Sequence, residues 1–220
     1  MPLFINLYNS ANGRQELNLQ GNWKINDKWS SGLFLHGNIR NQEIDGNEDN
    51  FLDVPLAKQI NILNRWQYTD TEKGWVSFGT IRFMNDKKQV GALGFNSTQD
   101  RGQNRLWGSE INTQRLDASI KIGYVFPELS YQSFGFQSAY SNHKQEAFYG
   151  FRVYDINHES VYTNLLFNSI IGNSKNKFKA GINFSYDRYQ ETVDTFYFNR
   201  DDHSVGSFFE YSYDSLENFT

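Results

Sequence analysis

The sequence predicts an all-β chain, a segment of an antiparallel transmembrane β-barrel built from about nine long strands. Three observations lead to this prediction. Apolar and polar residues alternate along many stretches, the connections between these stretches are alternately short and long, and aromatic residues gather beside the short connections. Alternation with a period of two is the pattern of a strand whose two faces meet different surroundings.

The alternation is clearest over residues 115–126, where Leu, Ala, Ile, Ile, Tyr and Phe share one face and Arg, Asp, Ser, Lys and Gly share the other. It is nearly as clear at 16–25, 29–39 and 177–187. Weaker alternation predicts the remaining strands at 57–69, 74–85, 130–142, 159–172 and 203–213. Strands of about 10–15 residues exceed the ~5–6 residues usual in soluble sheets. They reach the ~9–11 residues that a tilted transmembrane strand needs.

Residues 74–85 are ambiguous, because Arg82 would share a face with Val76, Phe78 and Met84. An arginine among apolar side chains does not identify which face of this strand is the polar one. The alternation therefore predicts a strand here without orienting it.

The predicted connections form two classes. Short ones lie near 26–28, 70–73, 127–129, 173–176 and 214–218, and long polar ones lie near 41–56, 86–111, 145–158 and 190–202. A regular exchange of tight turns on one side with long loops on the other is typical of outer-membrane barrels, where the turns are periplasmic and the loops extracellular.

Aromatic residues flank the short connections. They are Trp23, Trp29, Tyr68, Trp75, Tyr124, Phe126, Tyr131, Tyr211 and Tyr213. Aromatic residues favour strands in general, but their crowding at one rim predicts the girdle of rings found at a membrane interface.

The composition of the 220-residue chain excludes several classes of protein. It has no Cys, so it has neither disulfides nor thiolate metal sites. Its net charge of −4 argues against nucleic acid as a partner, since phosphate binding needs a basic surface. No apolar run approaches the ~18 residues of a spanning helix. The mean hydropathy of −0.68 still suits a membrane barrel, because lipid-facing and lumen-facing residues alternate.

The sequence predicts a partial barrel. Nine strands is an awkward number, because single-chain bacterial barrels use an even count, and unpaired strand edges are costly in lipid. The start, MPLFINLYNSANG, lacks the features of a signal peptide, and the end, YDSLENFT, looks like a turn leading into another strand. We therefore expect residues 1–220 to be one partial barrel domain, truncated at both ends.

Two stretches resemble the barrel of TonB-dependent outer-membrane receptors of the Bacteroidetes type. The first is DGNEDNFLDVPLAKQINILNRWQYTDTEKGWVSFGTIRF, residues 45–83, in which an acidic loop, FLDVPL, NRWQY, a tight turn and GWVSF follow one another. The second is EAFYGFRVYDINHESVYTNLLFNSIIG, residues 146–172, a loop followed by a strand. YSYDSLENFT is similar to a later periplasmic turn of the same family, so the resemblance covers nearly the whole chain.

The resemblance implies a location and a function. Such receptors are 22-stranded barrels in the bacterial outer membrane, and they take up bulky scarce nutrients such as siderophores, haem, cobalamin or glycans. The implied partners are the lipid bilayer, the rest of the barrel, an N-terminal plug, the nutrient, and the TonB complex, which acts through a TonB box ahead of the plug. This chain contains neither plug nor TonB box. Two alternatives stay open: a porin-like or structural barrel without energy coupling, and a soluble all-β carbohydrate-binding module.

The acidic loop is a candidate Ca²⁺ site. Oxygen-bearing side chains recur at Asp45, Asn47, Asp49 and Asp53, and Ca²⁺ takes six to eight oxygen ligands. An EF-hand loop would need Gly at its sixth position and Glu at its twelfth, where this chain has Asn50 and Leu56. A solvated acidic loop without a cation is the alternative. No other cofactor is predicted.

A second candidate site lies within the longest external connection. Arg101, Arg105 and Trp107 are predicted ligand contacts, because Trp can stack on a sugar or another ring and Arg can bind a carboxylate with two hydrogen bonds. Along the predicted strands, charged residues share the lumen-facing side. They are Arg40, Arg65, Arg115, Lys121, Lys177, Lys179, Asp117 and Asp187. Their mixed signs favour a hydrated wall over a selective anion site.

No catalytic residues are predicted, and we expect the chain not to be an enzyme. Three of the four histidines, His143, His158 and His203, fall in or near predicted loops, and none shares a ligand spacing with another or with His36. Nothing places two of the loop carboxylates across a cleft as in a glycosidase. No nucleophile elbow or phosphate-binding loop is present.

Overall fold

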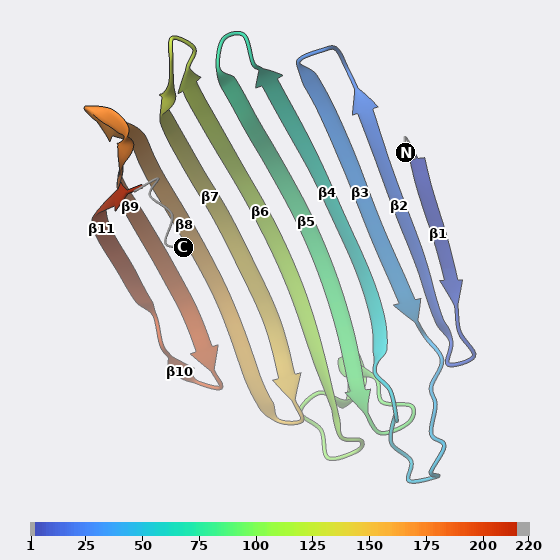
Figure 1. The fold of residues 1–220 in the computed structure, drawn as a ribbon. Helices are drawn as coiled ribbons and strands as arrows, with labels where there is room; N and C mark the ends of the chain where they lie inside the picture. The colour runs from blue at the N-terminus through green and yellow to red at the C-terminus, as the bar shows by residue number, and fades with distance from the viewer. Residues whose placement is uncertain (1–2, 215–220) are drawn as a thin grey trace, which may run out of the picture.

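The computed structural model describes residues 3–214 and shows one antiparallel sheet of eleven strands. Neighbours in sequence are neighbours in the sheet, from β1 to β9, and both β10 and β11 pair with β9 (Figure 1). The strands are β1 (Leu3–Asn9), β2 (Arg14–Lys24), β3 (Trp29–Arg40), β4 (Leu56–Asp70), β5 (Trp75–Gly91), β6 (Gly108–Phe126), β7 (Leu129–Tyr149), β8 (Arg152–Ile171), β9 (Asn173–Val193), β10 (Phe196–Tyr197) and β11 (Arg200–Tyr213). The prediction of an all-β antiparallel fold is confirmed.

The described part of the chain contains one short helix, α1 (Ser97–Asp100). Across residues 3–214, no helix is long and apolar enough to span a membrane.

The number of strands differs from the prediction of nine. β1 was not predicted, because its first six residues are apolar or aromatic on both faces except at Asn6 and give no clean alternation. Its register with β2, with Leu7 opposite Leu17, places it in the sheet all the same. β10 has only two residues and belongs to the connection between β9 and β11.

The two ends of the sheet carry different connections. At the upper edge of Figure 1, the turn end, the connections are residues 25–28, 71–74, 127–128 and 172, all short as predicted. The predicted short turn at 214–218 lies mostly outside the described residues. At the opposite edge, the loop end, residues 41–55 and 92–107 form long loops.

Two predicted long loops are wrong. Instead of a loop over 145–158, β7 and β8 continue until only Gly150 and Phe151 connect them, with Gly150 at a φ of 62°. Instead of a loop over 190–202, β9 runs to Val193 and β11 begins at Arg200. The polar residues of these stretches suggested loops, but they lie on strands that extend past the apolar part of the sheet.

The sheet has an apolar face and a polar face. On β6, the apolar face carries Leu116, Ala118, Ile120, Ile122 and Tyr124. The in-register pairing continues this face sideways, since Phe83 and Ile81 of β5 lie opposite Leu116 and Ala118. Further along, Phe136 of β7 pairs with Leu165 of β8, which pairs with Ile182 of β9.

Nothing in the described chain covers the centre of the apolar face. Among residues 3–214, the buried hydrophobic side chains are Ala92, Phe95, Ala147 and Phe148, all near the loop end. By contrast, Ile81 and Ile182 are more than half exposed. The described part of the molecule is therefore a single layer whose small core lies at the loop end.

Aromatic rings form a nearly continuous row along the turn end of the apolar face. Between neighbouring rings from β5 to β11 the centroid distances are 4.6–5.9 Å. The members of this aromatic row are Trp75, Tyr124, Phe126, Phe134, Phe167, Phe178 and Phe209. Trp29 and Tyr68 form a similar contact of 4.9 Å between β3 and β4. The predicted crowding of aromatics at one rim thus has a structural counterpart, which also includes four phenylalanines outside the predicted set, Phe134, Phe167, Phe178 and Phe209.

Candidate ligand-facing surface

The polar face is the candidate functional surface of the sheet. Residues that alternate with the apolar ones build it, such as Arg115, Asp117, Ser119 and Lys121 on β6. The sequence predicted that eight charged residues, from Arg40 to Asp187, share one side of the sheet. The alternation and the strand registers place all eight on the polar face.

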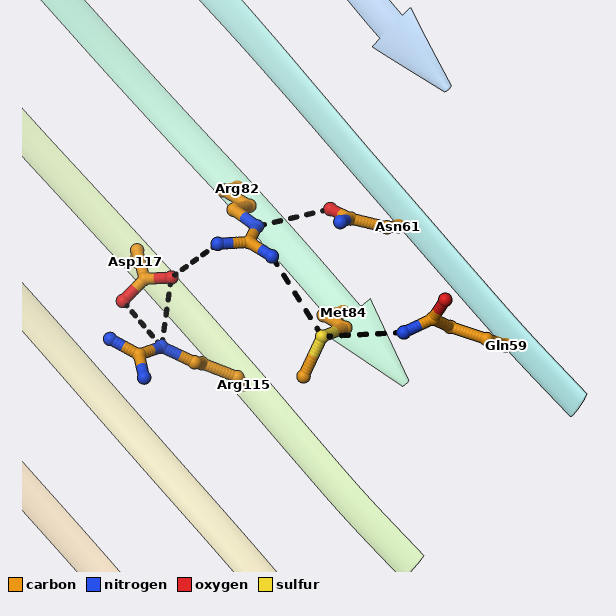
Figure 2. Close-up of polar contacts among 6 residues, drawn as sticks. All are labelled: Gln59, Asn61, Arg82, Met84, Arg115 and Asp117. Carbon is orange, nitrogen blue, oxygen red and sulfur yellow. Dashed lines mark hydrogen bonds and ion pairs between the residues drawn. The ribbon is translucent and has the colours of Figure 1, made fainter. Parts of the chain in front are cut away.

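A charged cluster on this face joins β4, β5 and β6 (Figure 2). Arg115 donates its Nε–H to both oxygens of Asp117, at 2.9 and 3.0 Å. Arg82 lies 4.0 Å from the same carboxylate and donates its Nε–H to Asn61 at 3.1 Å. Two guanidinium groups thus share one carboxylate, and the cluster keeps a positive bias.

This cluster resolves the ambiguous strand. Asp117 is the cross-strand partner of Arg82, so Arg82 belongs to the polar face together with Val76, Phe78 and Met84. Met84 accepts hydrogen bonds at its Sδ from Arg82 at 3.8 Å and from Gln59 at 3.9 Å (Figure 2). The apolar face of β5 is formed by Trp75, Ile81 and Phe83 instead, with Ser77 and Gly79 between them.

Asn61, Met84 and Arg115 of this cluster belong to a mostly polar row of side chains that crosses the sheet at one level, which we call the polar belt. In register order, the polar belt is Asn18, His36, Asn61, Met84, Arg115, His143, His158, Tyr189 and Arg200. Its members bond along the row: His36 Nδ1 lies 2.7 Å from Asn18 Oδ1, and the Arg200 guanidinium lies 3.8 Å from the centroid of the Tyr189 ring.

The expectation that the histidines lie in or near loops is wrong for His143 and His158. His143 on β7 and His158 on β8 are direct cross-strand partners. His158 Nε2 lies 2.8 Å from Asp187 Oδ1, and its ring stacks on Tyr189 at 4.2 Å. His143 Nδ1 is buried and has no hydrogen-bond partner in the described structure. His203 lies in β11 opposite Tyr186.

The histidine pair could have been found from the turn between β7 and β8. Positions equally distant from the Gly150–Phe151 connection face each other in a two-stranded hairpin, and 143 and 158 are such positions. Within residues 3–214, however, no three His, Asp or Glu side chains gather in a way that could hold a metal ion.

At the loop end, the two long loops fold together. Leu52 donates its N–H to the carbonyl of Gly91, and Leu93 donates to the carbonyl of Asn50, both at 2.9 Å. Phe95 is buried and packs on Phe148 of β7 with a centroid distance of 6.1 Å. We call residues 41–55 and 92–107 the loop unit, because backbone hydrogen bonds join the two loops.

The acidic residues of the predicted Ca²⁺ site organise their own turn. Asp45 accepts the N–H groups of Asp49 and Asn50 at 3.1 and 2.9 Å, and Asp53 accepts that of Gly46 at 2.7 Å. Asp49 accepts the N–H of Phe51 at 2.8 Å and the side-chain amide of Asn47 at 3.0 Å. Asn50 adopts the left-handed conformation, with a φ of 67°. These hydrogen bonds explain why oxygen-bearing side chains recur along the loop without requiring a cation. Ca²⁺ binding by the loop stays a prediction.

The three predicted ligand contacts all lie in the loop unit. Arg105 donates its Nε–H to Asp100 at 2.5 Å while its side chain stays 60% exposed. Arg101 lies over the Phe148 ring at 4.9 Å. Trp107 is half exposed, with its ring 6.3 Å from that of Phe51. Their role in binding a ligand stays a prediction.

Asp100 fixes the shape of this loop. It is buried at the end of α1, where it accepts hydrogen bonds from Arg105 and from the N–H of Asn96, the latter at 2.8 Å. The Arg105 guanidinium and this backbone donor hold the pKa of Asp100 below its ordinary value of 3.8. The carboxylate is therefore ionised at neutral pH, as the ion pair requires.

Comparison with known protein families, curated proteins and solved structures finds no match to this chain.

Proposed function

We propose that this chain forms part of the wall of a bacterial outer-membrane β-barrel of the TonB-dependent receptor kind. Its polar face would line the path of a bulky, scarce nutrient such as a siderophore, haem, cobalamin or a glycan. The observation that carries the proposal is the single-layer sheet, whose apolar face is uncovered and bordered at the turn end by the aromatic row.

An uncovered apolar face of this size fits lipid better than water. Soluble monomers rarely expose apolar patches larger than a few hundred Å², whereas this face crosses the sheet from β1 to β11. On β6 the apolar stretch 116–126 spans about 33 Å along the strand at ~3.3 Å per residue. At the ~40° tilt of barrel strands, this corresponds to a band about 25 Å tall, which is the height of the apolar band of outer-membrane barrels.

The soluble alternative has less support. A carbohydrate-binding sandwich needs a second sheet packed on the apolar face, about 10 Å away. Residues 3–214 form a single sheet, and the loop unit packs near the loop end rather than over the centre of the face.

The edges of the sheet support a larger barrel. Within residues 3–214, β1 pairs only with β2, and β11 pairs only with β9. Each unpaired backbone N–H or C=O costs several kcal/mol in lipid, so transmembrane sheets close on themselves. We therefore propose that further strands pair with β1 and β11, as a 22-stranded barrel would provide.

The porin-like alternative differs from the receptor in energy coupling. A receptor of the proposed kind works with a plug and the TonB complex, and the polar belt offers amide, imidazole and guanidinium groups to such a plug or to the nutrient. A porin-like barrel would use the same polar face as the wall of an open, hydrated channel.

Uptake by intact cells tests the proposal. We expect deletion of the gene to abolish accumulation of one member of a panel of radiolabelled ferric siderophores, haem, cobalamin and oligosaccharides. A protonophore should abolish the same uptake in the parent strain, because TonB coupling depends on the inner-membrane proton gradient. Uptake that depends on the gene but survives the protonophore would favour the porin-like alternative. A protein recovered from the soluble fraction without detergent would contradict both membrane functions.

A further inference from the structure

A shallow groove crosses the apolar face at the loop end of β1 to β4. Its apolar walls are Leu7, Leu17, Leu35, Ile39 and Ile60. Gly37 lies between Leu17 and Ile60 in the strand registers, and a Cβ atom built there would meet only the Gln59 carbonyl, at 3.7 Å. The missing side chain of Gly37 therefore opens the groove between two rows of aliphatic side chains.

Two lysines lie at the loop end of this groove. Lys58 lines it, and Lys87 of β5 is the direct cross-strand partner of Lys58 on the same face. Like charges directly opposite each other destabilise a strand pair. Lys87 Nζ lies 3.0 Å from Glu110, whereas Lys58 is exposed and makes no ion pair within residues 3–214. Two ammonium groups thus face one carboxylate.

The lysines lie just beyond the level at which the apolar face ends on β5 and β6. One step nearer the sheet centre, Ile60 pairs with Asn85, which pairs with Gln114. The face is therefore aliphatic along the groove and becomes polar and cationic at Lys58 and Lys87. In a membrane protein, long cationic side chains at such a border reach the headgroup layer.

We infer that the groove binds an anionic, phosphate-bearing membrane lipid. Its acyl chain would lie along the groove over Gly37, and its headgroup phosphate would contact Lys58 and Lys87. The inference rests on the proposed function, since it requires that the apolar face contact a bilayer. The aliphatic groove matches the acyl chain of such a lipid. The excess positive charge at its loop end matches the phosphate of the headgroup.

The expected preference is for anionic over zwitterionic lipids. A lysine near an anionic membrane surface contributes about 1 kcal/mol, or roughly fivefold in affinity. Because Glu110 partly neutralises Lys87, we expect about a fivefold preference for the pair. Gln in place of both lysines should bring the ratio close to one.

A fluorescent reporter beside the groove measures this preference. The chain has no cysteine, so Gln15→Cys provides a unique labelling position. Gln15 is exposed, lines the groove, and pairs with Ile39, the partner of Lys58. The whole protein, labelled there with bimane and reconstituted in phosphatidylcholine vesicles, would be titrated with brominated phosphatidylglycerol or brominated phosphatidylcholine as quencher.

The lysine variants are compared with a matched control. Lys144 lies on the same face and near the same level, but Glu146 pairs with it at 2.7 Å. Lys144→Gln should leave the preference for phosphatidylglycerol unchanged, whereas Lys58→Gln with Lys87→Gln should remove it. Gly37→Leu, which fills the groove and leaves the charges in place, should also weaken the preference.

The outcomes separate this inference from the proposed function. Stronger quenching by phosphatidylglycerol that depends on the two lysines supports the lipid site. Equal quenching by both brominated lipids overturns the lipid site and leaves the membrane placement standing. Absence of quenching by either lipid overturns the site together with the proposed placement of the apolar face.

Discussion

Replacing Ile120 by arginine is expected to lower the free energy of unfolding from a bilayer by about 2–4 kcal/mol, the cost of Arg at the middle of a barrel's lipid face. Ile120 lies midway along the apolar stretch of β6, is 42% exposed, and has Gly79 and Ser138 as its cross-strand neighbours. Neither neighbour offers a carboxylate, so the guanidinium of the introduced arginine would face hydrocarbon. Urea titration of the protein in phosphatidylcholine vesicles measures the loss.

Ser119→Arg is the matched control on the adjacent residue. Ser119 belongs to the polar face, between Asp117 and Lys121 along β6 and between Thr80 and Ala139 across the sheet. A guanidinium there meets other polar groups, and we expect a change below about 1 kcal/mol. Equal losses for the two variants, or a larger loss for Ser119→Arg, would contradict the assignment of the faces.

Replacing Gly74 by alanine is expected to destabilise the protein by about 2–3 kcal/mol. Gly74 ends the turn between β4 and β5 with a φ of +72°, and left-handed backbone costs other residues about 1–2 kcal/mol. A Cβ atom would lie 1.8 Å from the Val125 carbonyl oxygen, so this backbone must also move. Its movement would strain the hydrogen bond from the Val125 N–H to the Gly74 carbonyl, now 2.8 Å long.

Gly79→Ala provides the comparison within β5. No atom lies within 4 Å of a Cβ built on Gly79, and its φ is not positive. We expect a change within about 0.5 kcal/mol, as for substitutions away from strained or packed positions. The same urea titration measures both glycine variants. A loss for Gly79→Ala as large as that for Gly74→Ala would show that the turn conformation is not the cause.

Strands with a clean alternation could be predicted from the sequence almost to their bounds at the turn end. Residues 115–126 predicted the two faces of β6, because every position there is clearly apolar or polar. The faces of β5 could not be predicted, since Val76, Phe78 and Met84 lie on the polar face with Arg82. What orients β5 is Asp117, 35 positions away in sequence, and that contact depends on the register of two strands.

The loop end was harder to predict for a related reason. Beyond the apolar stretch, β7 and β8 carry polar residues on both faces, so their alternation disappears although their hydrogen bonding continues. This concealed the pairing of His143 with His158. The loop residues Arg101, Arg105 and Trp107 could be singled out by type, but the buried partner of Arg105, Asp100, depends on the turn of α1 and could not.

The proposed function depends above all on contact between the apolar face and lipid. Spin labels placed one at a time on cysteines at positions 115–122 of β6 test this claim most directly, through their accessibility to oxygen in the bilayer and to a water-soluble nickel complex. We predict a period of two, with high oxygen accessibility at 116, 118, 120 and 122 and lower values at the positions between them. High nickel accessibility at the even positions, or no alternation, would contradict the claim.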